Sequence, residues 1–165
     1  MGPPLDPEAN VWIAAESLAM RDDRTGKTLQ EKMAEGLVTI GPAVRIGRYC
    51  EIGPGVVLIE SNLDDDVEVG EGAYIARSSI RDGAIVGEGA TVRNSVIGSM
   101  SEVRSERQLA TAVEEYVALG DEVVVSPGVR LAGEVSVYPR LKVPFGIRVE
   151  QGAELARPRD VLDRL

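Results

Sequence analysis

Branched aliphatic residues recur along most of the chain at intervals of six, and sometimes five, positions. From Ile40 onward each unit begins with Ile, Leu or Val, often followed by Gly, and has a small or aliphatic residue four positions later. The segment Val69-Gly-Glu-Gly-Ala73 returns as Val86-Gly-Glu-Gly-Ala90. Such short-period self-similarity indicates a solenoid, in which each unit buries its apolar face against its neighbours. The pattern therefore predicts a stack of coils.

Aligning the units gives three columns of apolar residues, which we assign to the three faces of a triangular coil. The first column holds Ile40, Leu58, Ile75, Val92, Leu109, Val125 and Val143. The second holds Ile46, Leu63, Ile80, Ile97, Val113, Leu131 and Val149. The third holds Ile52, Val69, Val86, Val103, Leu119, Val137 and Leu155. We predict an all-β parallel β-helix of about seven triangular coils, with short strands whose apolar residues point into the axis.

Three steps between the columns are one residue shorter than the others, and all three fall on the same face. They run from Leu58 to Leu63, from Ile75 to Ile80 and from Val92 to Ile97. Each shortened step contains one serine, and these serines are Ser61, Ser78 and Ser95. We interpret them as a ladder of hydroxyl groups that bond the local backbone at a tightened turn.

Residues 104–118 fit the repeat least well. Their apolar residues lie at helical spacing, and Ser105 with Gln108 resembles a capping box. Arg107 also occupies a position that alanine fills in earlier coils. A regular register requires a step of only four residues from Leu109 to Val113. We favour a distorted fifth coil over an inserted helix.

The repeat divides the chain into an N-terminal lead and cap (residues 1–38), a β-helix (39–156) and a C-terminal tail or short helix (157–165). The segment Val11 to Met20 fits either a strand or a short helix, and we expect Trp12 to pack over the open end of the stack. Thr28 is predicted to cap a short helix over residues 29–35, which Gly36 ends.

The composition suits a stack of small aliphatic layers, because 44% of residues are hydrophobic but only 4% are aromatic. A net charge of -9 argues against nucleic-acid partners and anionic membranes. No signal peptide or long apolar run is present, so we expect a soluble, cytoplasmic protein. The chain has no histidine, which removes the commonest general base and transition-metal ligand.

Several motifs resemble binding sites without completing them. Gly26-Lys27-Thr28 resembles the end of a phosphate-binding loop, but Arg21 stands where that motif needs glycine. Gly70-Glu-Gly72 and Gly87-Glu-Gly89 resemble the start of a dinucleotide fingerprint but lack its third glycine. We interpret the first as a loop before a helix and the other two as corners of the coil.

Acidic residues offer the remaining candidates. Asp64-Asp65-Asp66 near Glu68 does not match the spacing of an EF-hand, and we expect Asp64 or Asp65 to pair with Arg48 and Arg81 at an exposed corner. Two further glutamates, Glu71 and Glu88, share one column and would suit a basic partner. Cys50, the single cysteine, falls at an inward position and is predicted to be a buried, inert thiol. We predict no catalytic, cofactor-binding or metal-binding residue.

The hexads from Ile40 to Leu155 resemble the left-handed β-helix of hexapeptide-repeat proteins. In that superfamily the acyltransferases use a catalytic histidine and the γ-class carbonic anhydrases bind metal through three histidines, all absent here. The mixed five- and six-residue steps, and segments such as Ser79–Ala90 and Val92–Gly98, are similar to the C-terminal β-helix of sugar-1-phosphate nucleotidyltransferases. Examples are mannose-1-phosphate guanylyltransferase and glucose-1-phosphate adenylyltransferase. The nucleotide-binding domain of those enzymes has no counterpart within these 165 residues.

The resemblance implies a non-catalytic, oligomerisation or regulatory β-helix domain of, or associated with, a sugar-1-phosphate nucleotidyltransferase. Its implied partners are further copies of the chain, as a trimer or dimer, and the nucleotidyltransferase catalytic domain, with no cofactor. One alternative is a stand-alone hexapeptide-repeat enzyme of the acyltransferase type with a base other than histidine. Another is a free-standing scaffold protein.

Overall fold

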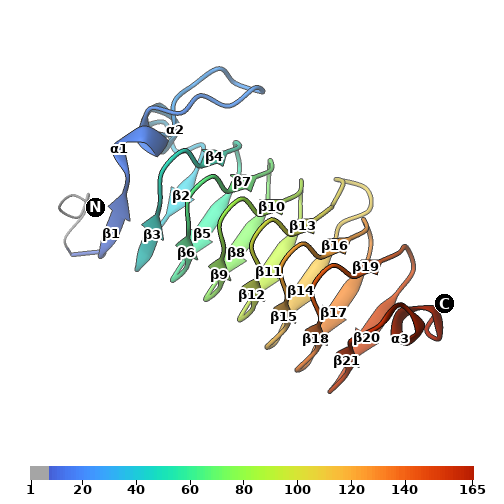
Figure 1. Ribbon diagram of the computed structural model, residues 1–165. Coiled ribbons are helices and arrows are strands. Elements are labelled where there is room, and N and C mark those ends of the chain that lie inside the picture. The colour runs from blue at the N-terminus through green and yellow to red at the C-terminus, as the bar shows by residue number, and fades with distance from the viewer. Residues whose placement is uncertain (1–7) are drawn as a thin grey trace.

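The computed structural model describes residues 8–165, which form a three-sided stack of parallel strands (Figure 1). The β1 sheet contains β1 (Val11–Ile13), β3 (Val44–Ile46), β6 (Asn62–Leu63), β9 (Ser79–Ile80), β12 (Val96–Ile97), β15 (Ala118–Leu119), β18 (Ser136–Val137) and β21 (Glu154–Leu155). The β4 sheet contains β4 (Glu51–Ile52), β7 (Glu68–Val69), β10 (Ile85–Val86), β13 (Glu102–Val103), β16 (Val124–Val125) and β19 (Lys142–Val143). The β2 sheet contains β2 (Thr39–Ile40), β5 (Val57–Ile59), β8 (Tyr74–Ala76), β11 (Thr91–Arg93), β14 (Ala112–Glu114), β17 (Arg130–Ala132) and β20 (Arg148–Glu150).

Each strand pairs in parallel with the strand of the same face in the next coil. Ile46, for example, lies opposite Leu63, which lies opposite Ile80. These side chains are almost completely buried, as is nearly every inward aliphatic residue of the stack. The burial follows from the repeat, because identical faces in register bring like residues into one continuous core. The predicted all-β, left-handed parallel β-helix of about seven coils, with a short N-terminal helix, is confirmed.

The predicted columns are wrong after Val103. Val113, and not Leu109, follows Val92 in the β2 sheet. Leu109 is 42% exposed, in a loop of residues 104–111 closed by an isolated bridge between Glu106 and Leu109. The four-residue step assumed from Leu109 to Val113 is too short for a corner. The chain instead connects β13 to β14 through the longer loop 104–111.

This loop moves every later apolar residue to a different face from the one predicted. The β2 sheet receives Val113, Leu131 and Val149, the β1 sheet receives Leu119, Val137 and Leu155, and the β4 sheet receives Val125 and Val143. The distorted coil that we favoured is correct, since no helix forms between residues 104 and 118. All of these residues remain buried, because each column requires only an aliphatic side chain.

The predicted serine ladder is confirmed at the tightened corner. Each serine hydroxyl donates a hydrogen bond to the carbonyl oxygen two residues earlier and accepts a hydrogen bond from a backbone N–H of the next coil. The Ser78 Oγ donates to the Ala76 oxygen at 2.8 Å and accepts from the Ser95 amide at 3.2 Å. Ser61 and Ser95 repeat this arrangement. The hydroxyls therefore satisfy backbone groups that the shorter corner would leave unpaired.

The N-terminal segment contains both structures that its sequence allowed. Strand β1 precedes α1 (Ala15–Leu18) and pairs with β3, so part of the predicted lead extends a face of the β-helix. Trp12 does not cover the open end as predicted: β1 turns it outward, where the Arg45 guanidinium lies 5.6 Å from its ring centre. Residues 1–7 of the predicted lead lie outside the described part of the chain, and the three-part division of the chain stays a prediction.

Short helices cover both ends of the stack. Helix α2 (Leu29–Ala34) begins at the predicted cap, where the Thr28 hydroxyl accepts from the Glu31 amide at 3.1 Å. Helix α3 (Pro158–Leu162) follows β21, and its Val161 is buried against the last coil. Helices α2 and α3 differ in sequence, but both cover the terminal layer of the core.

Candidate functional site

A buried ion pair fixes the N-terminal loop of residues 21–28 to the first coil. The Lys32 ammonium lies 2.6 Å from the Asp22 Oδ2 and also donates to the Ile52 carbonyl oxygen at the edge of β4. Asp22 further accepts the amides of Arg24 and Thr25 and the Thr25 hydroxyl. A buried ion pair is tolerated where its polar atoms are hydrogen-bonded in this way. The pair therefore determines where the loop lies.

The pKa of Asp22 is lowered to about 2. Burial alone would raise this pKa, but the hydrogen bonds from Lys32 and Thr25 outweigh it. A carboxyl whose pKa is lower in the folded protein than in the unfolded chain stabilises the fold above the unfolded value, near 3.8. That stabilisation is lost as the pH falls toward 2.

We therefore expect the Asp22→Asn variant to lose part of the acid sensitivity of the fold. Between about pH 5 and pH 2, the free energy of unfolding of the wild-type chain should fall by about 2 kcal/mol more than that of the variant. Urea titrations followed by circular dichroism at each pH measure the difference. Parallel pH profiles for the two proteins would contradict the assignment of this carboxyl.

Loop 21–28 carries Arg24 to two glutamates at the corner between the β4 and β2 sheets. The Arg24 guanidinium hydrogen-bonds the Glu88 Oε2 at 3.2 Å. It also lies 3.2 Å from the Glu71 Oε2, although that oxygen lacks a hydrogen bond of good geometry. From the other side, Arg107 of loop 104–111 lies 3.5 Å from Glu71 and 3.7 Å from Glu88. We call these four residues the corner cluster.

Glu71 and Glu88 were predicted to suit a basic partner, and in the corner cluster their basic partners are Arg24 and Arg107. The chain itself supplies both partners, from two loops far apart in sequence.

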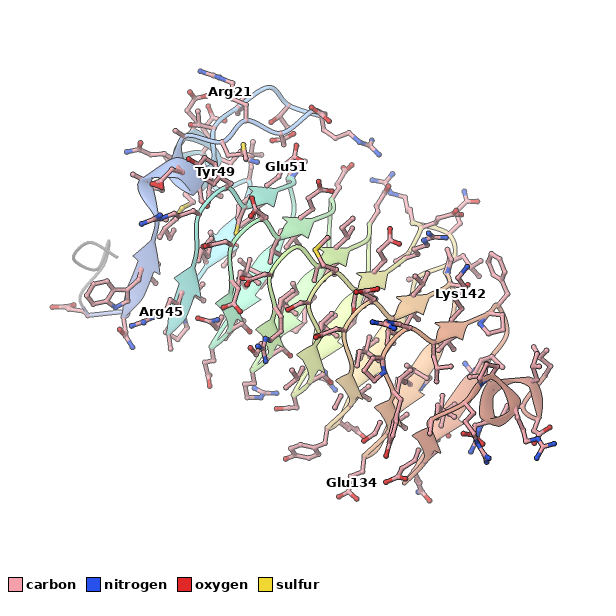
Figure 2. All side chains as sticks on the ribbon, viewed as in Figure 1. Arg21, Arg45, Tyr49, Glu51, Glu134 and Lys142 are labelled. Atoms are coloured by element: carbon pink, nitrogen blue, oxygen red, sulfur yellow. The ribbon has the colours of Figure 1, made fainter. Side chains whose placement is uncertain are left out.

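A cavity of about 280 Å³ lies between loop 21–28 and the β4 sheet, and its lining includes Asp22, Asp23, Arg24, Glu51, Glu68, Glu71 and Glu88. Burial, followed by the charges of Asp23 and Glu68, raises the pKa of Glu51, which Figure 2 shows beneath this loop. So acidic a cavity disfavours phosphates and nucleotides.

Arg107→Ala should loosen loop 104–111 without unfolding the coil. Exposed ion pairs contribute only about 0.2–1 kcal/mol and are screened by salt. We expect faster amide exchange at residues 104–111 in low salt and almost no difference from the wild type in high salt. Arg104→Ala, in the same loop but paired only with Glu102, is the matched control. A salt-independent change in exchange would argue against the ion pairs as the cause.

The other predicted motifs have structural roles. The two Gly-Glu-Gly segments are corners of adjacent coils, and a Cβ on Gly70 would stand 2.7 Å from the Glu88 nitrogen. The segment at Gly26 is the turn of loop 21–28, and its Lys27 pairs with Glu35. The amides of the glycines in these segments, Gly26, Gly70, Gly72, Gly87 and Gly89, donate to backbone carbonyl oxygens.

The aspartate corner is only partly as predicted. Arg81 lies 3.9 Å from Asp64, but the Arg48 side chain pairs with Glu16 instead. The Asp65 carboxylate accepts the Arg48 backbone amide at 2.8 Å, so it caps a turn of the neighbouring coil. Within residues 8–165 no group of three or more histidine, cysteine or acidic residues could hold a metal ion.

Cys50 is buried, as predicted. Burial, above all, raises the pKa of its thiol to about 11, so the thiol stays protonated and unreactive at neutral pH. Its Sγ lies 3.0 Å from the Asp64 carbonyl oxygen.

None of the helices within residues 8–165 has the length and apolar character that a membrane span requires.

Asp22, Arg24 and Lys32 were not among the residues predicted from the sequence to form a site. A signal for Lys32 was available, because it lies three residues after Leu29 on the buried face of α2. A lysine on an apolar helical face requires a buried acceptor or anion. Nothing in the local sequence indicates that Arg24 reaches Glu71 and Glu88, since that contact depends on how the loop folds over the coils.

The fold defines a parallel β-helix domain, and its ion-paired corner lies beside an acidic cavity. Residues 34–151 match the model of the GMPPB C-terminal domain, and the chain belongs to this family. The match covers most of the β-helix and confirms the resemblance to the C-terminal domain of sugar nucleotidyltransferases.

No curated protein matches the chain. Among solved structures it is similar to the acetyltransferase domain of PglB from Neisseria gonorrhoeae FA1090, with 19% identity and a TM-score of 0.31 over 88% of this chain and 70% of that one. So low a score carries no argument about function.

Proposed function

We propose that this chain is a non-catalytic β-helix domain that assembles subunits of, or associated with, a sugar-1-phosphate nucleotidyltransferase in the cytoplasm. The observation that carries the proposal is the family match over residues 34–151. The geometry supports it, because the charged side chains of the corner cluster are paired with one another and the thiol is buried. Neither group is arranged as a nucleophile with an adjacent base.

Assembly is tested with the 165-residue chain, by light scattering after size-exclusion chromatography over a concentration series. A dimer or trimer supports the proposal, and a strict monomer at every concentration contradicts the oligomerisation role. Co-purification with a separately expressed sugar-1-phosphate nucleotidyltransferase catalytic domain tests the second partner. Retention of that domain should weaken in high salt, because the β4 sheet presents an acidic surface.

A thiol-release assay with acetyl-CoA separates this role from that of an acyltransferase-type enzyme. We expect no turnover above that of the uncatalysed reaction. Clear turnover that is proportional to protein concentration would overturn the non-catalytic proposal.

A further inference from the structure

The C-terminal end of the β-helix leaves one strand edge open. Strand β20 is the last strand of the β2 sheet, and β19 is the last of the β4 sheet. Helix α3 packs against β21, which is the last strand of the β1 sheet. In Figure 1 this helix lies beside β20 and β21. In β19 the edge is interrupted, because Pro144 follows directly and has no backbone N–H. Strand β20 has no such protection.

The hydrogen-bond pattern shows which groups of β20 point outward along the stack. The Arg130 amide donates to the Ile147 oxygen and the Gln151 amide donates to the Ala132 oxygen, so Val149 is the residue of β20 whose backbone faces back toward β17. The N–H and C=O groups of Arg148 and Glu150 therefore face away from the coil. Unpaired edge groups of this kind are a template for another strand.

Charged side chains form an ion-pair series that leads to this edge. On the outer face of the β2 sheet Glu114 lies 3.3 Å from Arg93 and 3.3 Å from Arg130. Arg130 in turn lies 3.5 Å from Glu150 of the last strand. Arg148 is exposed and has no ion pair with any residue of the described chain. The series thus ends on β20 with one unpaired cation.

The charges of β20 are self-complementary. If two copies of β20 pair antiparallel with Val149 opposite Val149, each Arg148 lies directly opposite a Glu150 of the other copy. In that register these residues form the hydrogen-bonded pairs, so the free N–H and C=O groups described above are all satisfied. The two-fold symmetry makes both charge pairs equivalent, as an isologous interface requires.

Apolar residues with no cover lie in the same terminal region. Leu162 of α3 is 59% exposed, Leu165 is 74% exposed and Phe145 is 60% exposed. A cavity of about 410 Å³ between β19 and α3 is lined by apolar side chains together with Arg140 and Lys142. Exposed large apolar residues gathered at one end are typical of an interaction surface.

We infer that the C-terminal end of the β-helix is a dimer interface, in which β20 pairs antiparallel with β20 of a second copy and Arg148 faces Glu150 across the two-fold axis. The inference rests on the proposed assembly role and names the surface that performs it. It joins two β2 sheets into one continuous sheet, with the two α3 helices beneath the junction.

Charge reversal tests the pairing. Arg148→Glu and Glu150→Arg each place like charges opposite one another twice in the dimer, and each should raise the dimer dissociation constant about tenfold. The double variant Arg148→Glu/Glu150→Arg restores opposite charges and should return the dissociation constant to near the wild-type value. Glu154→Arg is the matched control, since it makes the same charge change on β21, the strand that α3 packs against. Sedimentation velocity measures the association, and thermal unfolding confirms that each variant folds.

Amide exchange at Arg148 and Glu150 gives a second readout. Their amides should become protected as the protein concentration rises through the dimer range, and this protection should be absent in Arg148→Glu. Protection already present in the monomer would overturn the inference, because another segment of the chain would then cover the edge.

The outcomes separate the two proposals. A wild-type chain that is monomeric at every concentration contradicts the assembly role itself. A wild-type oligomer that both single charge reversals leave unchanged overturns only the β20 interface. Loss in the single variants with recovery in the double variant establishes it.

Discussion

Replacing Lys32 with methionine should destabilise the fold by about 3–5 kcal/mol. The lysine is fully buried, and its ammonium lies 2.6 Å from the Asp22 carboxylate. Methionine fits the same volume, but it leaves a buried carboxylate without its cation and the Ile52 carbonyl without its donor. Removing one partner of a buried pair costs more than the pair contributes, because the remaining charge stays desolvated.

Two further variants distinguish a charge effect from a packing effect. Asp22→Asn/Lys32→Met removes both charges but keeps an acceptor for the Arg24 and Thr25 amides, so most of the lost stability should return. Lys27→Met removes the exposed pair with Glu35 and should cost about 0.2–1 kcal/mol. Urea unfolding followed by circular dichroism measures all three. A double variant as unstable as Lys32→Met would show that packing, and not charge, causes the loss.

Leu131→Ala should destabilise the fold by about 2–5 kcal/mol, whereas Leu109→Ala should cost well under 1 kcal/mol. Leu131 is fully buried within the β2 sheet, so its truncation leaves a cavity that neighbouring coils cannot fill without shifting. Leu109 is 42% exposed and lies in loop 104–111, where it forms an isolated bridge with Glu106. The same chemical change therefore has a different cost at two positions that the repeat alone treats as equivalent.

Chemical denaturation of the two leucine variants measures this contrast directly. Equal destabilisation would mean that Leu109 occupies the core and that the register after Val103 is the one predicted from the sequence. The slope of the unfolding transition with denaturant should stay constant in both variants, because neither changes the surface exposed on unfolding.

Ion pairs between coils have different outcomes in the middle of the stack and at its C-terminal end. In the corner cluster Arg24 and Arg107 pair with the repeated glutamates of adjacent coils within one chain. At the C-terminus the series through Arg130 reaches Glu150, while Arg148 of the same strand stays unpaired. Repeats generate such rows of charge wherever a corner or strand position is copied, and a row without an internal partner is suited to a second copy of the chain.

The repeat predicted most of the fold because each coil carries nearly the same information. Ile46, Leu63 and Ile80 occupy equivalent places, so a local pattern of aliphatic residues specifies the strands, the corners and their stacking direction. The shortened corner and its serines were predicted for the same reason, since three copies reveal a spacing that one copy would hide.

Loop 104–111 and the partners of the charged residues needed the tertiary structure. Leu109 and Val113 are both aliphatic, and only the length of chain needed to turn a corner excludes Leu109 from the core. Arg24 reaches Glu88 across a separation of 64 positions, because the buried pair of Asp22 and Lys32 holds its loop over the coils. Local periodicity determined the coil, because every unit repeats the same short-range geometry. Contacts between unlike segments were decided by the folded chain, because a charge can pair with any opposite charge that the fold brings within reach.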